Sequence, residues 1–171
     1  MSILSRILGK PEGDREAMRP LWHRTVEIAR EKQWYAECGV ADTLSGRFDA
    51  VTLVLSLVLL RMERAEALIE PSVRLTEIFV DDMDGQMRQS GVGDLVVGKH
   101  MGKLMGTLGG RLGALRAALP QGANALAPVL ERNVTLIDDT DVQRLSAAVL
   151  ELYSGLAQTS DADLLAGRIK R

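Results

Sequence analysis

The sequence predicts an all-α protein, a single compact multi-helix domain, and three observations support this. Aromatic residues make up only 4% of the 171 residues, while leucine, alanine, arginine and glutamate are abundant, which favours helices over strands. Residues 50–60 read AVTLVLSLVLL, which is apolar on every side of a helix and predicts a buried element. Apolar residues recur at helical spacing along residues 94–119. We therefore expect two central helices, at about residues 48–69 and 94–119.

Residues 1–12 are expected to form an N-terminal amphipathic segment ahead of a helical domain at residues 13–171. Its short apolar face consists of Ile3, Leu4, Ile7 and Leu8. The pattern ends at Pro11 and Gly13, because both residues break helices. Docking on the domain is the favoured interpretation of this segment, and a position on a membrane surface is the alternative.

The first half of the domain contains two predicted helices. Pro20 suits the first turn of a helix that runs to about residue 33, followed by a short helical turn that ends near Gly39. Asp42 is the expected N-cap of the next helix. A buried β-strand at residues 53–60 is the alternative for the apolar run, but the charged continuation to Glu70 favours a helix.

The next helices are predicted from their start and stop signals. Pro71 is expected to end the helix at residues 48–69, and Ser72 to cap one that runs to about residue 89. Glycines at 91 and 93 form the turn into the helix at residues 94–119, for which Asp94 is the expected N-cap. Residues 120–122 end that helix.

The C-terminal third is predicted to add further helices. Residues 123–133 are expected to be helical, and residues 134–137 could be extended. Thr140 and Gln143 match a capping box for a helix to about residue 157. Ser160 and Asp163 indicate a short final helix.

A glycine stripe marks the helix at residues 94–119, with glycines at 98, 102, 106 and 110 and further ones at 109 and 113. Each glycine in a helix interior costs about 0.5–1 kcal/mol relative to alanine. We expect close packing of another helix to offset this cost. A transmembrane association motif is disfavoured, because Lys99, Lys103 and Arg111 lie on the same helix. A phosphate-binding loop is disfavoured because the sequence lacks GxxxxGK[ST].

Charge and cysteine content suggest a location but no partner. The net charge of −2 gives no overall attraction to nucleic acid or membrane. Residues 61–87 carry seven acidic and three cationic side chains, whereas residues 88–119 carry five cationic and one acidic. Cys38 is the single cysteine, which indicates a reducing compartment. No secretory signal is recognisable, so we expect a cytoplasmic protein, with a peripheral position at the inner membrane as a further possibility.

No combination of residues predicts catalysis. The acidic run Asp81–Gly85 has the composition of a calcium loop, but Val80 and Gly91 then fall at ligand positions. His23 and His100 have no neighbouring partner at metal-ligand spacing. We therefore expect neither an enzyme nor a bound cofactor or metal.

Two features on the helices around residue 91 could serve binding. The first is a group of flexible thioethers, which suit adaptable apolar contacts: Met83, Met87, Met101 and Met105, with Met62 as a further member. Core filling is the alternative, and the favoured one from spacing alone. The second is a basic helix face formed by Lys99, His100, Lys103 and Arg111. This face could meet anionic lipid, RNA or an acidic partner, or could be ordinary solvated charge.

Two longer stretches are distinctive: WYAECGVADTLSGRFD at residues 34–49 and FVDDMDGQMRQSGVGDLVVGKHMGKL at residues 79–104. Over about residues 20–119 the chain resembles the ubiquinol–cytochrome c chaperone family. The resemblance implies an all-helical, non-enzymatic protein that binds newly made cytochrome b. It also implies a role in assembling the ubiquinol–cytochrome c reductase (bc1) complex of the respiratory chain.

Together with this resemblance, the residue pattern leads to a hypothesis for the client-binding surface. Methionines would contact the client, and cations would orient it or the membrane, through Met83, Met87, Arg88, Lys99, Met101, Lys103, Met105 and Arg111. The expected partner is cytochrome b or another bc1 subunit, with the membrane surface or the ribosome as further candidates and no DNA. We expect a monomer. The alternative function is a helical scaffold or a ribosome- or RNA-associated module that uses the basic face of the helix at residues 94–119.

Overall fold

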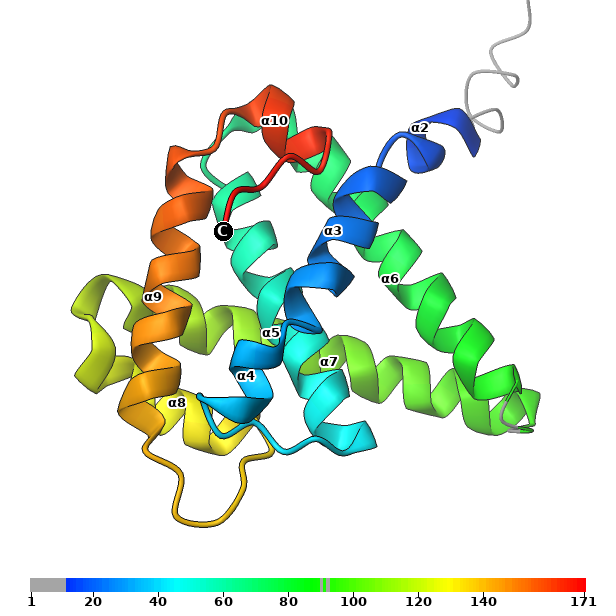
Figure 1. Ribbon diagram of the computed structural model, residues 1–171. Helices are drawn as coiled ribbons and strands as arrows, with labels where there is room; N and C mark the ends of the chain where they lie inside the picture. Colours follow the sequence, from blue (N-terminus) through cyan, green and yellow to red (C-terminus); the bar gives the residue numbers. More distant parts are fainter. Residues whose placement is uncertain (1–11, 90, 92) are drawn as a thin grey trace, which may run out of the picture.

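The computed structural model describes residues 12–89, 91 and 93–171, which are helical apart from connecting segments and one isolated β-bridge (Figure 1). The elements are α2 (Glu12–Glu16), α3 (Arg19–Ala29), α4 (Lys32–Ala36), α5 (Leu44–Met62), η1 (Glu66–Leu68), α6 (Ile69–Gln89), α7 (Asp94–Ala118), η2 (Leu119–Gln121), α8 (Ala123–Asn133), α9 (Val142–Gln158) and α10 (Asp161–Leu165). The all-α prediction is confirmed. The predicted amphipathic segment at residues 1–12 lies, up to residue 11, outside the described residues.

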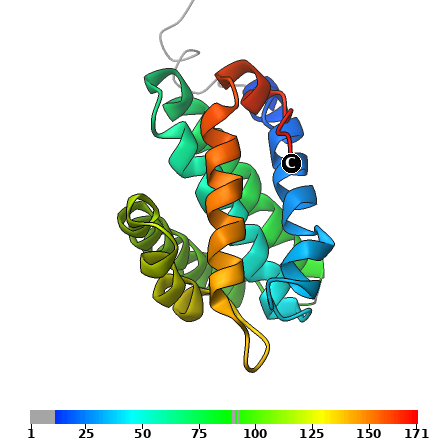
Figure 2. The same cartoon turned by 60° about the vertical axis from the view of Figure 1, so that its left-hand side comes forward.

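Helix α5 is the centre of the fold, with α3, α7 and α9 packed around it (Figures 1 and 2). Between residues 50 and 62 every side chain except Val51 is buried. The two hydroxyls in this stretch are satisfied within the helix: Thr52 Oγ1 donates to the Phe48 carbonyl at 3.1 Å, and Ser56 Oγ donates to the Thr52 carbonyl at 2.7 Å. The apolar run is therefore a buried helix as predicted, and the β-strand alternative is wrong.

The start of α5 differs from the prediction. The N-cap is Thr43, whose Oγ1 accepts a hydrogen bond from the Gly46 amide at 3.1 Å. The predicted cap, Asp42, instead accepts a hydrogen bond from Arg47 Nε at 2.6 Å. A glycine is required three residues after the cap, because a Cβ at Gly46 would lie 1.9 Å from the Ala41 carbonyl oxygen.

The helix predicted at about residues 20–33 is divided into α3 and α4. The break at residues 30–31 is bridged by Trp34, whose indole Nε1 donates to the Ile28 carbonyl at 2.6 Å. A second tryptophan connects α3 to α6: Trp22 lies edge-on to Phe79 with ring centroids 5.9 Å apart, and its Nε1 donates to Asp82 at 2.6 Å.

One predicted helix end and two predicted N-caps in this part of the chain are also wrong. The helix predicted to end near residue 69 ends at Met62. Pro71 does not stop it, because Pro71 lies inside the first turn of α6, where a missing amide hydrogen costs nothing. Ser72 is not a cap, because its hydroxyl donates to the Ile69 carbonyl at 2.7 Å. Asp94 is the first residue of α7 rather than its N-cap; Gly93 holds the cap position.

Residues 134–137 are extended, as the sequence allowed. Val40 and Leu136 form an antiparallel bridge, in which the Ala41 amide donates to the Thr135 carbonyl at 2.9 Å. This bridge ties the segment between α4 and α5 to the segment between α8 and α9.

The C-terminal helices begin close to the predicted residues. Asp141 rather than Thr140 caps α9, since its carboxylate accepts a hydrogen bond from the Gln143 amide at 3.1 Å. Ser160 caps α10 as predicted, with the Asp163 amide donating to its hydroxyl at 3.2 Å. Among the described helices, none has the length and hydrophobicity needed to cross a bilayer.

The prediction that the glycine stripe of α7 packs closely against another helix is wrong. A Cβ would meet no atom within 4 Å at Gly98, Gly102, Gly106, Gly109, Gly110 or Gly113. Helix α7 instead buries a different face, through Val97, Leu108 and Leu115. These glycines therefore face open space, and no contact among the described residues offsets their cost to the helix.

Candidate functional site

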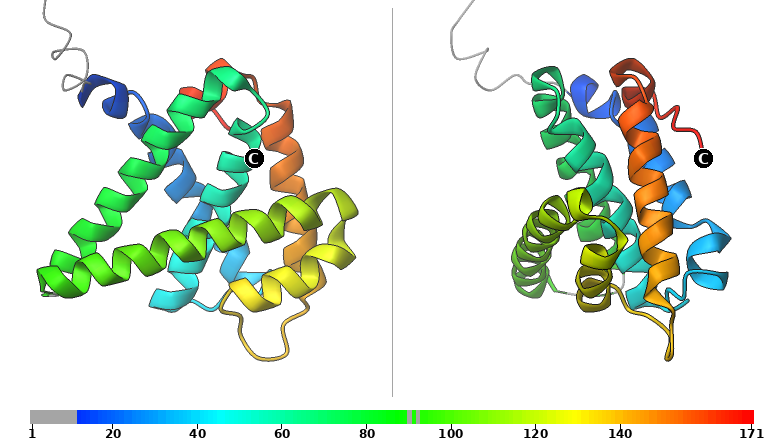
Figure 3. Two further views of the ribbon diagram at one scale, coloured as in Figure 1. Left: turned by 180° about the vertical axis from the view of Figure 1, so that it is seen from behind. Right: turned by 90° about the vertical axis from the view of Figure 1, so that its left-hand side faces the viewer.

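Helices α6 and α7 form an arm that diverges from a tight turn near Gly91, as the view from behind shows (Figure 3). Gly91 has a φ of 81°, a left-handed conformation that glycine adopts without strain. Arg88 joins the two helices across this turn, because its guanidinium contacts Asp84 on α6 at 2.7 Å and also Asp94 on α7. The two ion pairs of Arg88 therefore hold the helices together at the turn, and the helices separate beyond it.

A stripe of partly exposed side chains runs along one side of α6. Its members alternate at steps of three and four, which places them on one side of a helix: Val73, Thr76, Val80, Met83 and Met87. This α6 stripe is separate from the buried residues that hold α6 to the rest of the domain, Leu75, Ile78 and Phe79. The stripe is only partly covered; Val73 is 50% exposed.

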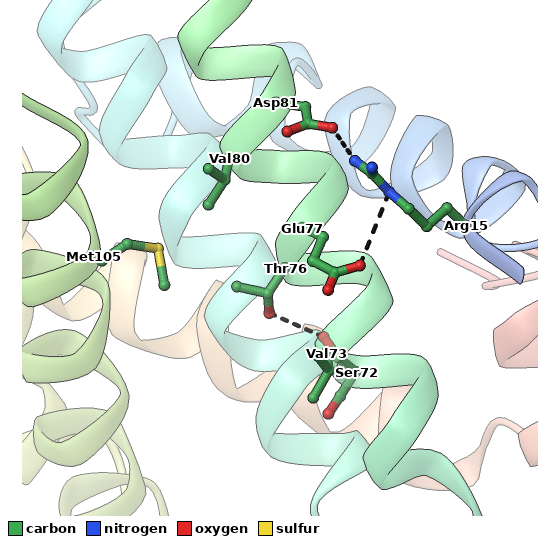
Figure 4. A pocket seen from close by; sticks show the side chains of 8 residues that line it. All are labelled: Arg15, Ser72, Val73, Thr76, Glu77, Val80, Asp81 and Met105. Carbon is green, nitrogen blue, oxygen red and sulfur yellow. Dashed lines mark hydrogen bonds and ion pairs between the residues drawn. The ribbon is translucent and has the colours of Figure 1, made fainter. Parts of the chain in front are cut away.

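A groove of about 390 Å³ opens along part of the α6 stripe (Figure 4). It is lined by Arg15, Ser72, Val73, Thr76, Glu77, Val80, Asp81 and Met105. Met105 reaches the groove from α7 and lies opposite the α6 side chains. Its side chain is 39% exposed, so a flexible thioether forms one wall of an open, largely apolar site.

One rim of the groove is charged. Arg15, on α2, points toward α6, where its guanidinium contacts Asp81 and lies 3.9 Å from Glu77 (Figure 4). Glu77 is also 3.1 Å from Arg74 on its own helix. Two carboxylates on the rim are therefore paired with two guanidiniums, and Asp81 is the more exposed of the two carboxylates, with 63% of its side chain accessible.

The predicted methionines all lie on the arm but have different surroundings. Met83 and Met87 belong to the α6 stripe and are half-buried, as is Met101 on α7. Met83 also packs against the hydrophobic core. Met62, the further member considered from the sequence, is fully buried in α5 and is core filling. Of these residues, only Met105 lines the groove.

The predicted basic face is smaller than the sequence suggests. Lys99, His100 and Lys103 are exposed on α7, but Arg111 is buried at 8% exposure, so its assignment to the binding surface is wrong. Arg88 is exposed, although its charge is balanced by the two aspartates of the turn.

Arg111 is buried because it holds α7 to α5 through an ion pair. Its guanidinium donates to Asp49 and to the Thr52 hydroxyl. The second oxygen of Asp49 accepts hydrogen bonds from the Thr135 amide at 2.9 Å and the Thr135 hydroxyl at 2.7 Å. One carboxylate thus links α5, α7 and the extended segment after α8.

Sequence reasoning missed the groove residues on α6. The missed residues, Val73, Thr76 and Val80, continue the helical spacing of the predicted Met83 and Met87 toward the start of α6. Arg15 had no such signal, because its partner Asp81 is 66 residues away along the chain.

Potential metal ligands are scattered through the described part of the chain. Within it, no group of three or more potential metal ligands comes together. Cys38 is buried, and this burial raises the pKa of its thiol, with the Glu37 carboxylate acting in the same direction. The thiol is therefore neutral and shielded, which does not suit a nucleophile.

Comparison with known proteins identifies the family of the chain. Residues 36–171 match the family described as Ubiquinol-cytochrome C chaperone. A crystal structure described as the Cbp3 homolog from Brucella abortus is 34% identical, with a TM-score of 0.79 over 98% of this chain and 95% of that one. No curated protein matches the chain. The chain belongs to the ubiquinol–cytochrome c chaperone family.

Proposed function

We propose that the chain is a non-enzymatic assembly chaperone that holds newly made cytochrome b through the groove between α6 and α7. The family supports a general role in assembly of the bc1 complex. The observation that carries the finer proposal is the open apolar groove, lined by Val73, Thr76 and Val80 of the α6 stripe on one side and by Met105 on the other.

The chemistry of the groove suits an unfinished membrane protein. Transmembrane segments expose apolar side chains until they are inserted, and a concave apolar surface can cover part of one. Thioether side chains adapt to varied apolar shapes, so contact through Met105 in the groove, and through Met83, Met87 and Met101 elsewhere on the arm, would be weak for any one sequence but tolerant of many. A chaperone that must release its client needs this combination.

The charged residues of α7 have a secondary part in the proposal. Lys99 and Lys103 are exposed, and we assign them to orienting the client or the membrane surface. The RNA-binding alternative is weaker, because Arg111 is buried in an ion pair and Arg88 is balanced by aspartates.

The test is a pulldown of the tagged full-length chain from membranes of cells that make cytochrome b. Val80→Asp and Met105→Asp each place a charge in the groove, and we expect recovery of cytochrome b to fall about tenfold. Ile137→Asp, at a 54% exposed residue between α8 and α9, is the matched control and should leave recovery unchanged. Circular dichroism checks that each variant is folded. Unchanged recovery with both folded groove variants would contradict the proposed site.

A further inference from the structure

We propose that Asp81 selects apolar client helices that carry a lysine or arginine at one end, and that Arg15 occupies this carboxylate until the client's cation replaces it. The inference rests on the proposed function, because it concerns the same groove and adds the chemical class of segment that the groove accepts.

The charged rim runs along one side of the groove, beside α2 and away from Met105. Asp81 and Glu77 lie one helical turn apart on α6 and both line the groove beside Val80. Glu77 already has Arg74 at 3.1 Å, whereas the ion pair formed by Asp81 is with Arg15. Asp81 retains 63% side-chain exposure in this pair, so a cation from outside can reach it.

The groove also matches a segment of mixed apolar and cationic character. A helix seated against Val73, Val80 and Met105 would bury apolar side chains and lie beside the exposed carboxylate of Asp81. Transmembrane helices have this arrangement at their cytoplasmic ends, where lysine and arginine flank the apolar stretch. Charge complementarity therefore favours this class of partner over an acidic or uncharged amphipathic helix.

The rim already holds a guanidinium that comes from a separate element. Arg15 belongs to α2, a helix of five residues that packs against α6. Its side chain is 40% exposed, and exposed ion pairs are weak enough to exchange partners. When the client's cation replaces Arg15, the cation pairs with Asp81 and the Arg15 guanidinium is solvated. The exchange therefore costs little free energy.

The experiment measures binding of two fluorescein-labelled peptides to the full-length chain. Both are helices of leucine and alanine of about 14 residues; one ends in Lys-Arg and the other in Gln-Gln. We expect the Lys-Arg peptide to bind about three- to fivefold more tightly. Asp81→Asn should remove this preference, and Arg15→Ala should widen it by making the carboxylate free. Arg15→Lys should restore the ratio of the unmodified chain.

The matched control for Asp81→Asn removes one negative charge at a site away from the groove. Asp138→Asn, at an exposed residue between α8 and α9, should keep the full preference for the Lys-Arg peptide. Equal affinity for the two peptides, with Val80→Asp still abolishing both, would overturn the role of Asp81 and leave the groove as the client site. Binding of both peptides that survives Val80→Asp and Met105→Asp would overturn the proposed function itself. Sedimentation that shows a dimer dissociated by the same two substitutions would assign the groove to a second copy and also overturn the inference.

Discussion

Helices α5 and α7 cross in the structure, yet their surroundings are opposite (Figure 1). Helix α5 is buried around nearly its whole circumference, whereas in the first half of α7, residues 94–107, Val97 is the one buried side chain. The glycine of α5, Gly46, is required by a backbone contact, while the glycines of α7 face open space. The difference separates a packed body from an arm whose surface is available to a partner.

The ion pair between the body and the arm should show the largest effect. Asp49→Ala leaves the buried guanidinium of Arg111 without its carboxylate, and we expect a loss of about 3–5 kcal/mol in the free energy of unfolding. Urea unfolding followed by circular dichroism measures this loss. Asp42→Ala, which removes an exposed ion pair with Arg47, is the control and should cost much less, because solvent screens exposed pairs. Similar losses for the two variants would mean that Asp49 is not a structural anchor.

Truncating leucines compares body and arm directly. Leu55→Ala creates a cavity beside fully buried neighbours in α5, and we expect it to destabilise the chain by about 2–5 kcal/mol. Leu95→Ala, at a side chain that is 94% exposed on α7, should change stability by no more than about 0.5 kcal/mol. The midpoints of urea unfolding report both values. A large loss at Leu95 would show that this end of the arm is packed after all.

Glycine-to-alanine substitutions should change the stability of the chain in opposite directions in α7 and in α5. Alanine at Gly102, Gly106 or Gly110 adds a Cβ that meets nothing within 4 Å, so each should stabilise the chain by about 0.5–1 kcal/mol. Gly46→Ala places a Cβ against the Ala41 carbonyl and should destabilise it. Thermal unfolding distinguishes the two signs. Destabilisation by alanine along α7 would restore the idea that the stripe packs internally.

The reaction rate of a thiol should differ between the body and the arm. Cys38 in the body is buried and its pKa is raised, so its thiolate becomes populated only at a pH above the ordinary range for a cysteine. We expect Cys38 to react slowly with a disulfide reagent at pH 8 until the chain unfolds. A cysteine introduced by Met105→Cys in a Cys38→Ser chain should react faster. Equal rates in the folded state would contradict the difference in exposure.

The sequence was sufficient for the parts of the fold that depend on local pattern. The all-round hydrophobicity of residues 50–60 predicted the buried helix, and Ser160 was recognised as a cap. Asp42 and Asp94 were mistaken for caps because a carboxylate beside a helix start can instead pair with an arginine, here Arg47 and Arg88.

Features that depend on long-range packing could not be predicted. Spacing on α7 placed Arg111 beside Lys103, but burial of its guanidinium depends on Asp49, which is 62 residues away. The glycine stripe likewise has a regular spacing whichever way it faces. Which side of a helix meets the core is decided by the whole set of partners, and α7 contributes Leu108 and Leu115 to the core.

Site-specific crosslinking to newly made cytochrome b tests the central claim most directly. A photoreactive residue is placed singly at Val80 and Met105 in the groove and at Ile137 between α8 and α9. We predict that cytochrome b is captured from the two groove positions and not from Ile137. Capture from Ile137, with none from Val80 or Met105, would contradict the assignment of the client to the groove.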